Sequence, residues 1–300
     1  MTEQDDHLNR PEKPIFRSQG DVWRFLHAQS DVPADQLPFF ELAMALGSVL
    51  TPGMSLDPYR AQIQKIVDDI QDWLDEAVDE GLPNNLDVLM DIVTKVLHQE
   101  YGFTGDDQDF DNIENANILR VMDRRKGLPI ALGVLYLTIL DHFECDAVGL
   151  NFPGHFVLRV HKDGQSMLID PFRDGRVLQA HDLREILKAV SGENAELSHD
   201  FYTDIDRREV LVRLQNNVEK RLITEEEYAK AVEIVDASIA FAPHEYRLYL
   251  DSGVLRAKLG EYDGALSALE TYITMTPDPH GKREAEAIIH QIKLGYDSSS

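Results

Sequence analysis

The sequence contains a single cysteine, Cys145, among its 300 residues. One cysteine can form neither an intrachain disulfide nor a cage of several thiolates around a metal ion. The sequence also lacks a run of 18 apolar residues, about the length that a membrane-spanning helix needs. The first twenty residues are polar and hold no apolar stretch typical of a secretory signal. Together these absences predict a soluble protein of the reducing cytoplasm.

Positive charge is scarce, because 29 Lys and Arg residues face 54 Asp and Glu residues, which gives a formal net charge of −25. Proteins bind nucleic acids largely by neutralising phosphates with cationic side chains. Anionic membrane surfaces also attract basic segments. We therefore expect neither a nucleic acid nor a membrane as a partner. The hydrophobic fraction of 43% is typical of a globular chain and excludes wholesale disorder.

The order of the sequence patterns predicts an α+β chain. Residues 1–20 are charged and proline-containing and are expected to form a flexible tail. Helical periodicity follows to about residue 101, and a strongly apolar helix is expected over 129–143. Between residues 146 and 172 the period changes to that of strands. A last helix near 182–190 completes a domain that we expect to span residues 21–200.

An acidic loop between the predicted helices has the spacing of a calcium site in part. Asp107, Asp109 and Asp111 alternate as calcium ligands do, but an EF-hand also needs Gly at its sixth position and Glu at its twelfth. Asn112 and Ile118 stand at those positions. We predict no metal ion here, and the sequence indicates no cofactor elsewhere.

The last hundred residues repeat with a period of 34. Tyr228, Ala231, Val235 and Pro243 are followed at that offset by Tyr262, Ala265, Leu269 and Pro277. The period and the residue types resemble the tetratricopeptide repeat, a helix–turn–helix unit. The first copy departs from the pattern, since Glu219 and Glu226 stand where small residues are expected. We predict an all-α repeat domain over 201–300 with a capping helix near 280–293, and an ordinary helical bundle is the alternative.

The resemblance to tetratricopeptide repeats implies that the first helix of each repeat lines a concave, peptide-binding face. That face would present Arg213, Asn216, Lys220, Arg247 and Lys258. Cations gathered in one groove of an acidic protein favour an acidic peptide partner. Solvated Lys and Arg side chains that pair within their own helices would give the same pattern.

Candidate chemistry lies on a predicted β-hairpin. Asp163-Gly164 between alternating strands is a strong two-residue turn signal, and it predicts that paired residues have numbers summing to 327. In that register His155 and Asp170 lie diagonally on one face. The opposite face is predicted to be core and consists of Phe156, Leu158, Val160, Met167 and Ile169. A His–carboxylate pair is the orienting half of a nucleophilic triad, in which the acid sets the imidazole tautomer.

Three motifs in this order resemble the SirB-type family, which joins a degenerate transglutaminase-like domain, related to papain, to C-terminal tetratricopeptide repeats. They are Arg125-x-Gly127-Leu128-Pro129-Ile130, Pro153-Gly154-His155-Phe156 and Asp170-Pro171-Phe172. An Asn-containing segment before the first motif is also typical, and Asn115 or Asn117 fits it. The resemblance extends over about residues 35–295. It implies a helical N-terminal part, a papain-like core with a small antiparallel sheet, and the repeat domain described above.

The sequence departs from active transglutaminase-like enzymes at the nucleophile. Those enzymes place a cysteine at the start of the helix, where the helix dipole favours a thiolate. Pro129 stands at about that position here, and Cys145 follows the far end of the same helix. We therefore predict a non-catalytic adaptor or regulatory protein that binds a protein or peptide. A hydrolase or amidase that uses His155, Asp170 and water is the alternative, and capture of a peptide end without cleavage is a third hypothesis.

Overall fold

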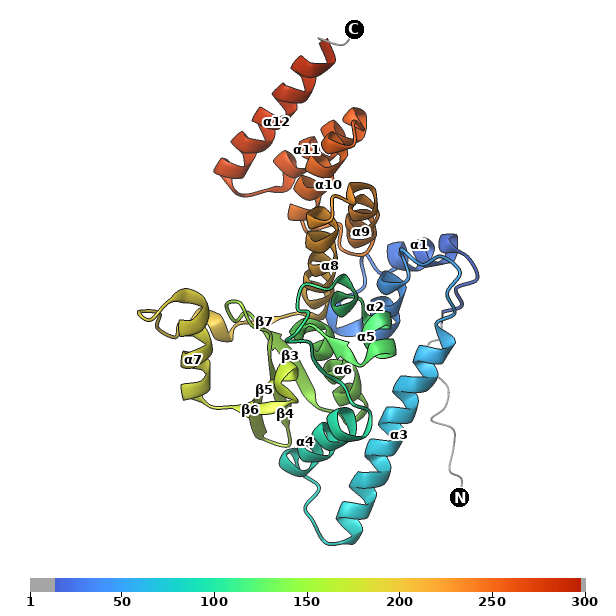
Figure 1. The fold of residues 1–300 in the computed structure, drawn as a ribbon, viewed down its shortest axis with the longest axis vertical. Coiled ribbons are helices and arrows are strands. Elements are labelled where there is room, and N and C mark those ends of the chain that lie inside the picture. Colours follow the sequence, from blue (N-terminus) through green and yellow to red (C-terminus); the bar gives the residue numbers. More distant parts are fainter. Residues whose placement is uncertain (1–13, 298–300) are drawn as a thin grey trace.

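The computed structural model describes residues 14–297. Figure 1 shows a sheet with helices around it, from which the C-terminal helices extend along the long axis of the molecule. Before the sheet come α1 (Gln19–Ala28), α2 (Phe39–Gly47), α3 (Asp57–Asp79), α4 (Leu86–Thr94), α5 (Ile118–Arg124) and α6 (Pro129–His142). α4 continues as a π-helical segment, Lys95–Glu100, and short 3₁₀ turns occur at Ala34–Gln36, Ile113–Ala116, Pro171–Arg173 and His199–Tyr202.

The five-stranded sheet is antiparallel throughout, with the order β6-β5-β4-β3-β7. Its strands are β3 (Asp146–Leu150), β4 (Val157–Lys162), β5 (Gln165–Asp170), β6 (Arg176–Leu178) and β7 (Asp204–Ile205). A separate parallel pair joins β1 (Thr104–Gly105) to β2 (Lys126–Gly127). Helix α6 packs against one face of the five-stranded sheet, and α7 (Ala180–Ser191) packs against the other through a small cluster that includes Leu183 and Leu187.

The predicted hairpin register is confirmed. Leu158 pairs with Ile169 and Lys162 with Gln165, so both pairs sum to 327. Asp163 and Gly164 have φ angles of 49° and 79°, the positive values that a type I′ turn requires at both central positions.

Residues 14–20, which the sequence assigned to a flexible tail, are packed against the domain. The Phe16 ring meets Phe25 edge-on at 5.2 Å, and Arg60 donates to the Pro14 carbonyl. Ser18 caps α1 through a reciprocal bond with Asp21. The short segment gave no signal of this packing, because a contact such as that of Arg60 with Pro14 joins residues far apart in the sequence. The rest of the predicted tail, residues 1–13, lies outside the described residues.

The C-terminal part consists of helix pairs that repeat the same local geometry. Its helices are α8 (Arg207–Thr224), α9 (Tyr228–Phe241), α10 (Arg247–Lys258), α11 (Tyr262–Met275) and α12 (Pro279–Asp297). The turn before α9 places Glu226 at φ 60°, and the matching turn before α11 places Gly260 at φ 76°. Glu226 thus takes a left-handed conformation that the second repeat gives to glycine, which explains why the first copy of the pattern is weaker.

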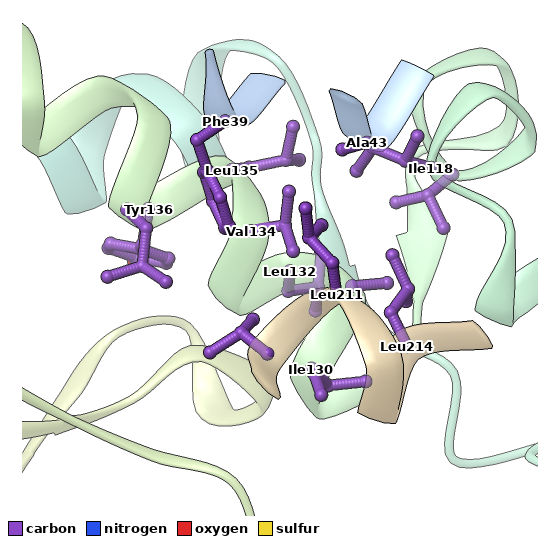
Figure 2. Packing of buried hydrophobic residues seen from close by; sticks show 14 of the residues in the cluster. Phe39, Ala43, Ile118, Ile130, Leu132, Val134, Leu135, Tyr136, Leu211 and Leu214 are labelled. Carbon is purple, nitrogen blue, oxygen red and sulfur yellow. The ribbon is translucent and has the colours of Figure 1, made fainter. Parts of the chain in front are cut away.

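The first repeat shares its core with the sheet-containing part. One hydrophobic cluster runs from Val22 to Leu255, and it includes α6 along nearly its whole length. Figure 2 shows Leu211 and Leu214 of α8 among the side chains around Ile130 of α6. The last helices form a smaller cluster of their own, which includes Leu269 and Ala285. Residues near 200 therefore mark a change from sheet to repeats without a break in the core.

Gly133 of α6 allows the helix to approach the segment before β4 that carries His155 and Phe156. A Cβ added at Gly133 would lie 2.3 Å from the Phe156 ring, far inside van der Waals contact. We expect Gly133→Ala to lower the free energy of unfolding by about 1–3 kcal/mol, because the Phe156 ring must move. A shift of the urea midpoint at constant m-value would measure this loss. An unchanged midpoint would contradict the packing described here.

Candidate functional site

His155 and Asp170 form a direct hydrogen bond. The imidazole Nε2 lies 2.8 Å from Asp170 Oδ2, as their diagonal placement on the hairpin predicted. Asp170 is 2% exposed, and its Oδ1 accepts from the backbone N–H groups of Phe172, at 2.9 Å, and Arg173, at 3.3 Å. Because a carboxylate only accepts, Nε2 of His155 carries the hydrogen, and Nδ1 is the nitrogen left for another partner. The acid therefore fixes both the tautomer and the orientation of the ring.

Helix α6 begins beside this pair. Leu128 precedes the helix in an extended conformation, and Pro129 occupies the first helical position, where its missing N–H costs no hydrogen bond. No side chain caps this helix start. The N–H of Ile130, at the second position, therefore has no partner within the helix, and the positive end of the α6 dipole is uncapped.

A pocket of about 340 Å³ joins the two parts of the chain at this point. From the sheet-containing part it receives Pro129 and His155, and from α8 it receives Arg213, Asn216 and Lys220. The structure thus brings together five of the residues that the sequence singled out. One wall is apolar and consists of Phe110, Leu128, Ile130, Phe152 and Phe156, and Asn217 completes the polar wall. None of these lining residues is a cysteine, serine or threonine.

The polar side chains of α8 differ in how many hydrogen bonds and ion pairs they make within the protein. Arg213 donates to Glu209 and to Asn151, so its charge is largely paired within the protein. The Lys220 ammonium is exposed and makes no ion pair with any described residue. Asn216 has a buried side-chain oxygen that accepts no hydrogen bond within residues 14–297.

Phe110 closes one side of the pocket, and the sequence gave no indication of this role. Its ring meets Phe172 edge-on at 5.9 Å, and it is 47% exposed. Arg221 of α8 donates to the carbonyl groups of Phe110 and Asp111, which fixes the acidic loop against the first repeat. The sequence signal that could have indicated this role is a single aromatic residue within an otherwise acidic loop.

Three predicted binding residues lie elsewhere. Asn115 is fully buried, and its amide bonds Asp106, the Asp109 carbonyl and Arg124. Its backbone carbonyl also accepts from the N–H of Leu128, so Asn115 supports the start of α6 from behind without lining the pocket. Arg247 lies over the ring of Tyr246, and Lys258 lies over the ring of Tyr228.

Two carboxyl groups make the repeat groove less cationic than the sequence suggested. Glu219 of α8 is 6% exposed, and burial together with the charge of Asp251 raises its pKa to about 8. Burial also raises the pKa of Asp251 of α10, to about 6, although Lys220 and Arg247 oppose this. The repeat pattern expects a small residue where Glu219 stands, and this departure was the sequence signal for the buried Glu219–Asp251 pair.

Cys145 lies away from the pocket. It follows α6 at the end opposite Pro129, beside a second cavity of about 270 Å³ that also contains Leu137 and Asp146. The thiol is 6% exposed, and burial raises its pKa. Within residues 14–297 no three His, Cys, Asp or Glu side chains gather closely enough to hold a metal ion. No helix in that same range is long and apolar enough to span a bilayer.

Replacing Asp170 tests whether it holds His155 in place. We expect Asp170→Asn to lower the free energy of unfolding by about 1–3 kcal/mol, because a charge-assisted bond to a buried carboxylate is lost. The amide nitrogen can donate to Nε2, so we also expect a shift of the neutral ring toward the tautomer with hydrogen on Nδ1. Nitrogen NMR of the imidazole would show this change. A ring that keeps its hydrogen on Nε2 would contradict the assigned role.

Two family models match this chain, and they meet within α8. The model of the transglutaminase-like superfamily matches residues 57–216, and that of the tetratricopeptide repeat matches residues 219–293. A UPF0162 protein of Xylella fastidiosa (strain Temecula1) is 25% identical over 262 residues, which cover 86% of this chain and 90% of that protein. Protein SirB1 of Salmonella typhimurium is 28% identical over 185 residues, covering 61% of this chain and 68% of SirB1.

Two further proteins resemble this chain. F-box only protein 21 of Pongo abelii is 26% identical over 205 residues, which cover 64% of this chain and 32% of that protein. A crystal structure of menin covers 94% of this chain and 76% of its own, at 13% identity and a TM-score of 0.36. That score is too low to support an argument about the site.

Proposed function

Because this chain belongs to the transglutaminase-like superfamily and, like SirB-type proteins, continues into tetratricopeptide repeats, we propose that it is a non-catalytic adaptor whose pocket binds a protein partner. One observation carries the proposal. The pocket combines the His155–Asp170 pair with Asn216 and Lys220 of the first repeat helix, and it is also lined by Pro129, the residue that the family resemblance aligns with the nucleophile of active enzymes.

The composition of the pocket supports binding over covalent chemistry. An acyl-enzyme route needs a nucleophilic side chain within reach of the imidazole. The proline ring at the helix start has no atom that can attack a carbonyl. Repeat proteins of this class use the concave side of their helices to hold partner segments. The pocket extends that surface onto the transglutaminase-like domain, so one partner segment would contact both parts of the chain.

A pull-down with paired variants tests this function. The pocket variant carries Asn216→Ala and Lys220→Ala, and the control variant carries Arg247→Ala and Lys258→Ala on α10, in the same repeat array but outside the pocket. We expect a specific partner from the source organism's lysate to bind the wild type and the control, and to be reduced at least tenfold on the pocket variant. Equal recovery of every partner on all three proteins would contradict a role for the pocket.

A water-dependent hydrolase is the second candidate, and the buried Asp170 with its three hydrogen bonds favours it. That carboxylate leaves Nδ1 of His155 as an acceptor beside the pocket, which is the arrangement a general base requires. The two candidates differ in what His155→Ala does. An enzyme of this kind loses its turnover in that variant, whereas an adaptor has no turnover to lose.

A further inference from the structure

The pocket brings together groups that stabilise a negative charge. In a thiol enzyme of this fold, an imidazole and the positive end of a helix would stabilise a thiolate. Here Pro129 supplies no charge, while His155 and the uncapped start of α6 remain. Lys220 adds a positive charge to the same pocket; it forms no ion pair with a residue in the described range, although its charge also acts on the carboxyl groups of Glu219 and Asp251.

We propose that this pocket binds a carboxylate group of a partner peptide, and this inference rests on the proposed function. The carboxylate would lie where active relatives have their nucleophile, and the peptide would carry an apolar side chain next to it. The carboxylate would accept from Lys220 and from the N–H of Ile130, and from Nδ1 of His155 when the ring is protonated. Asp170 already holds Nε2, so the ring can offer only Nδ1 to the ligand.

The remaining lining residues indicate that the carboxylate belongs to a peptide. Asn216 lines the pocket, and its side-chain amide can donate to a backbone carbonyl of a peptide. Opposite the polar side chains, Phe110, Phe152 and Ile130 form an apolar wall that suits an aliphatic or aromatic side chain. A volume of about 340 Å³ lies at the small end of ligand pockets, so it would take one or two residues of a chain.

Lys258 provides a matched control for Lys220, because it is a cation of the same repeat array that does not line the pocket. Lys258 is on α10, and its ammonium lies 4.9 Å from the centre of the Tyr228 ring. Replacing Lys258 removes the same charge from the same repeat array without altering the pocket. Any effect of net charge on an anionic peptide would therefore be equal for Lys220→Ala and Lys258→Ala, whereas a local contact would affect Lys220→Ala alone.

Two sources of the carboxylate are chemically equivalent in the pocket, namely a free C-terminus and an Asp or Glu side chain. Three peptides distinguish them: acetyl-Gly-Ala-Leu with a free carboxylate, the same peptide amidated, and amidated acetyl-Gly-Glu-Leu. Binding is followed by NMR on the ¹⁵N-labelled full chain, at the side-chain amide of Asn216 and the backbone N–H of Ile130. Thermal unfolding of each variant reports whether it is folded.

We expect saturable shifts at both reporters with one or both carboxylate peptides, and at least fivefold weaker binding of the neutral amide. Lys220→Ala should weaken the carboxylate peptides at least fivefold, with Lys258→Ala unchanged. Equal binding of the neutral peptide, equal loss in both lysine variants, or no shift at millimolar peptide would each overturn the inference. Those results would leave the adaptor function standing if the pull-down partner still depended on Asn216 and Lys220.

Discussion

Replacing Pro129 with cysteine is expected to create a thiol that reacts with iodoacetamide at pH 6 about tenfold faster than a free cysteine does. A helix N-terminus and a neighbouring imidazole lower a thiol pKa from about 8.5 to as low as about 3.5–7.5. At a pKa near 6 the thiolate fraction at pH 6 rises by about two orders of magnitude, and lower intrinsic nucleophilicity removes about one of them. Substitution of a proline at the first helical position disturbs no hydrogen bond of α6.

The chain supplies an internal comparison for this experiment. Cys145 is buried and its pKa is raised, so it should react more slowly than a free thiol. Peptide mapping by mass spectrometry separates the two positions in one sample. Adding His155→Ala to the Pro129→Cys protein should return the introduced thiol to the rate of a free cysteine. A rate that is ordinary from the start, or one that His155→Ala does not change, would contradict the placement of Pro129 beside the imidazole.

The second large effect is expected at Glu219, whose replacement by glutamine should stabilise the protein at alkaline pH. The folded-state pKa of about 8 lies above the ordinary value of 4.5, so the folded protein holds this proton more tightly than the unfolded chain does. Stability therefore falls as pH rises from about 4.5 and reaches its minimum above about 8. Because one pKa unit corresponds to about 1.4 kcal/mol, Glu219→Gln should add about 2–4 kcal/mol above pH 8 and little near pH 5.

The charged groups around Glu219 are part of this prediction. Asp251 raises the pKa of Glu219, and Lys220 lowers it. Asp251 is in turn influenced by Lys220, Arg247 and Glu245. Urea midpoints of the wild type, Glu219→Gln and Glu233→Gln at pH 5, 7 and 9 provide the test, since Glu233 is exposed on α9. A gain for Glu219→Gln that is the same at all three pH values, or matched by Glu233→Gln, would contradict a buried, protonated carboxyl group.

The local patterns of the sequence predicted most of the fold because they depend on neighbouring residues. The Asp163-Gly164 turn determined the register, and the segment just before β4 then brings His155 to Asp170 at the end of β5. The 34-residue period located the starts of α9 and α11, at Tyr228 and Tyr262. These features follow from turn chemistry and repeat spacing, which need no knowledge of distant contacts.

The pocket could be predicted only in part, because it depends on how α8 packs against α6. The sequence assigned Arg213, Asn216 and Lys220 to a groove of the repeats, and the structure places them across from Pro129 and His155. The common core that joins the first repeat to α6 decides this arrangement, and it is formed by residues about eighty positions apart, such as Ile130 and Leu211. For the same reason Phe110 was missed, while Arg247 and Lys258 were expected in a groove whose lining does not include them.

A turnover comparison between the wild type and His155→Ala decides whether the protein is a non-catalytic adaptor or an enzyme. The measurement follows hydrolysis of a broad set of esters and amides by the two purified proteins, with thermal unfolding to show that the variant is folded. The adaptor function predicts equal background rates, because a ring beside Pro129 has no nucleophile to activate. Hydrolysis by the wild type that this single substitution abolishes would show an enzyme that uses water and would contradict the account.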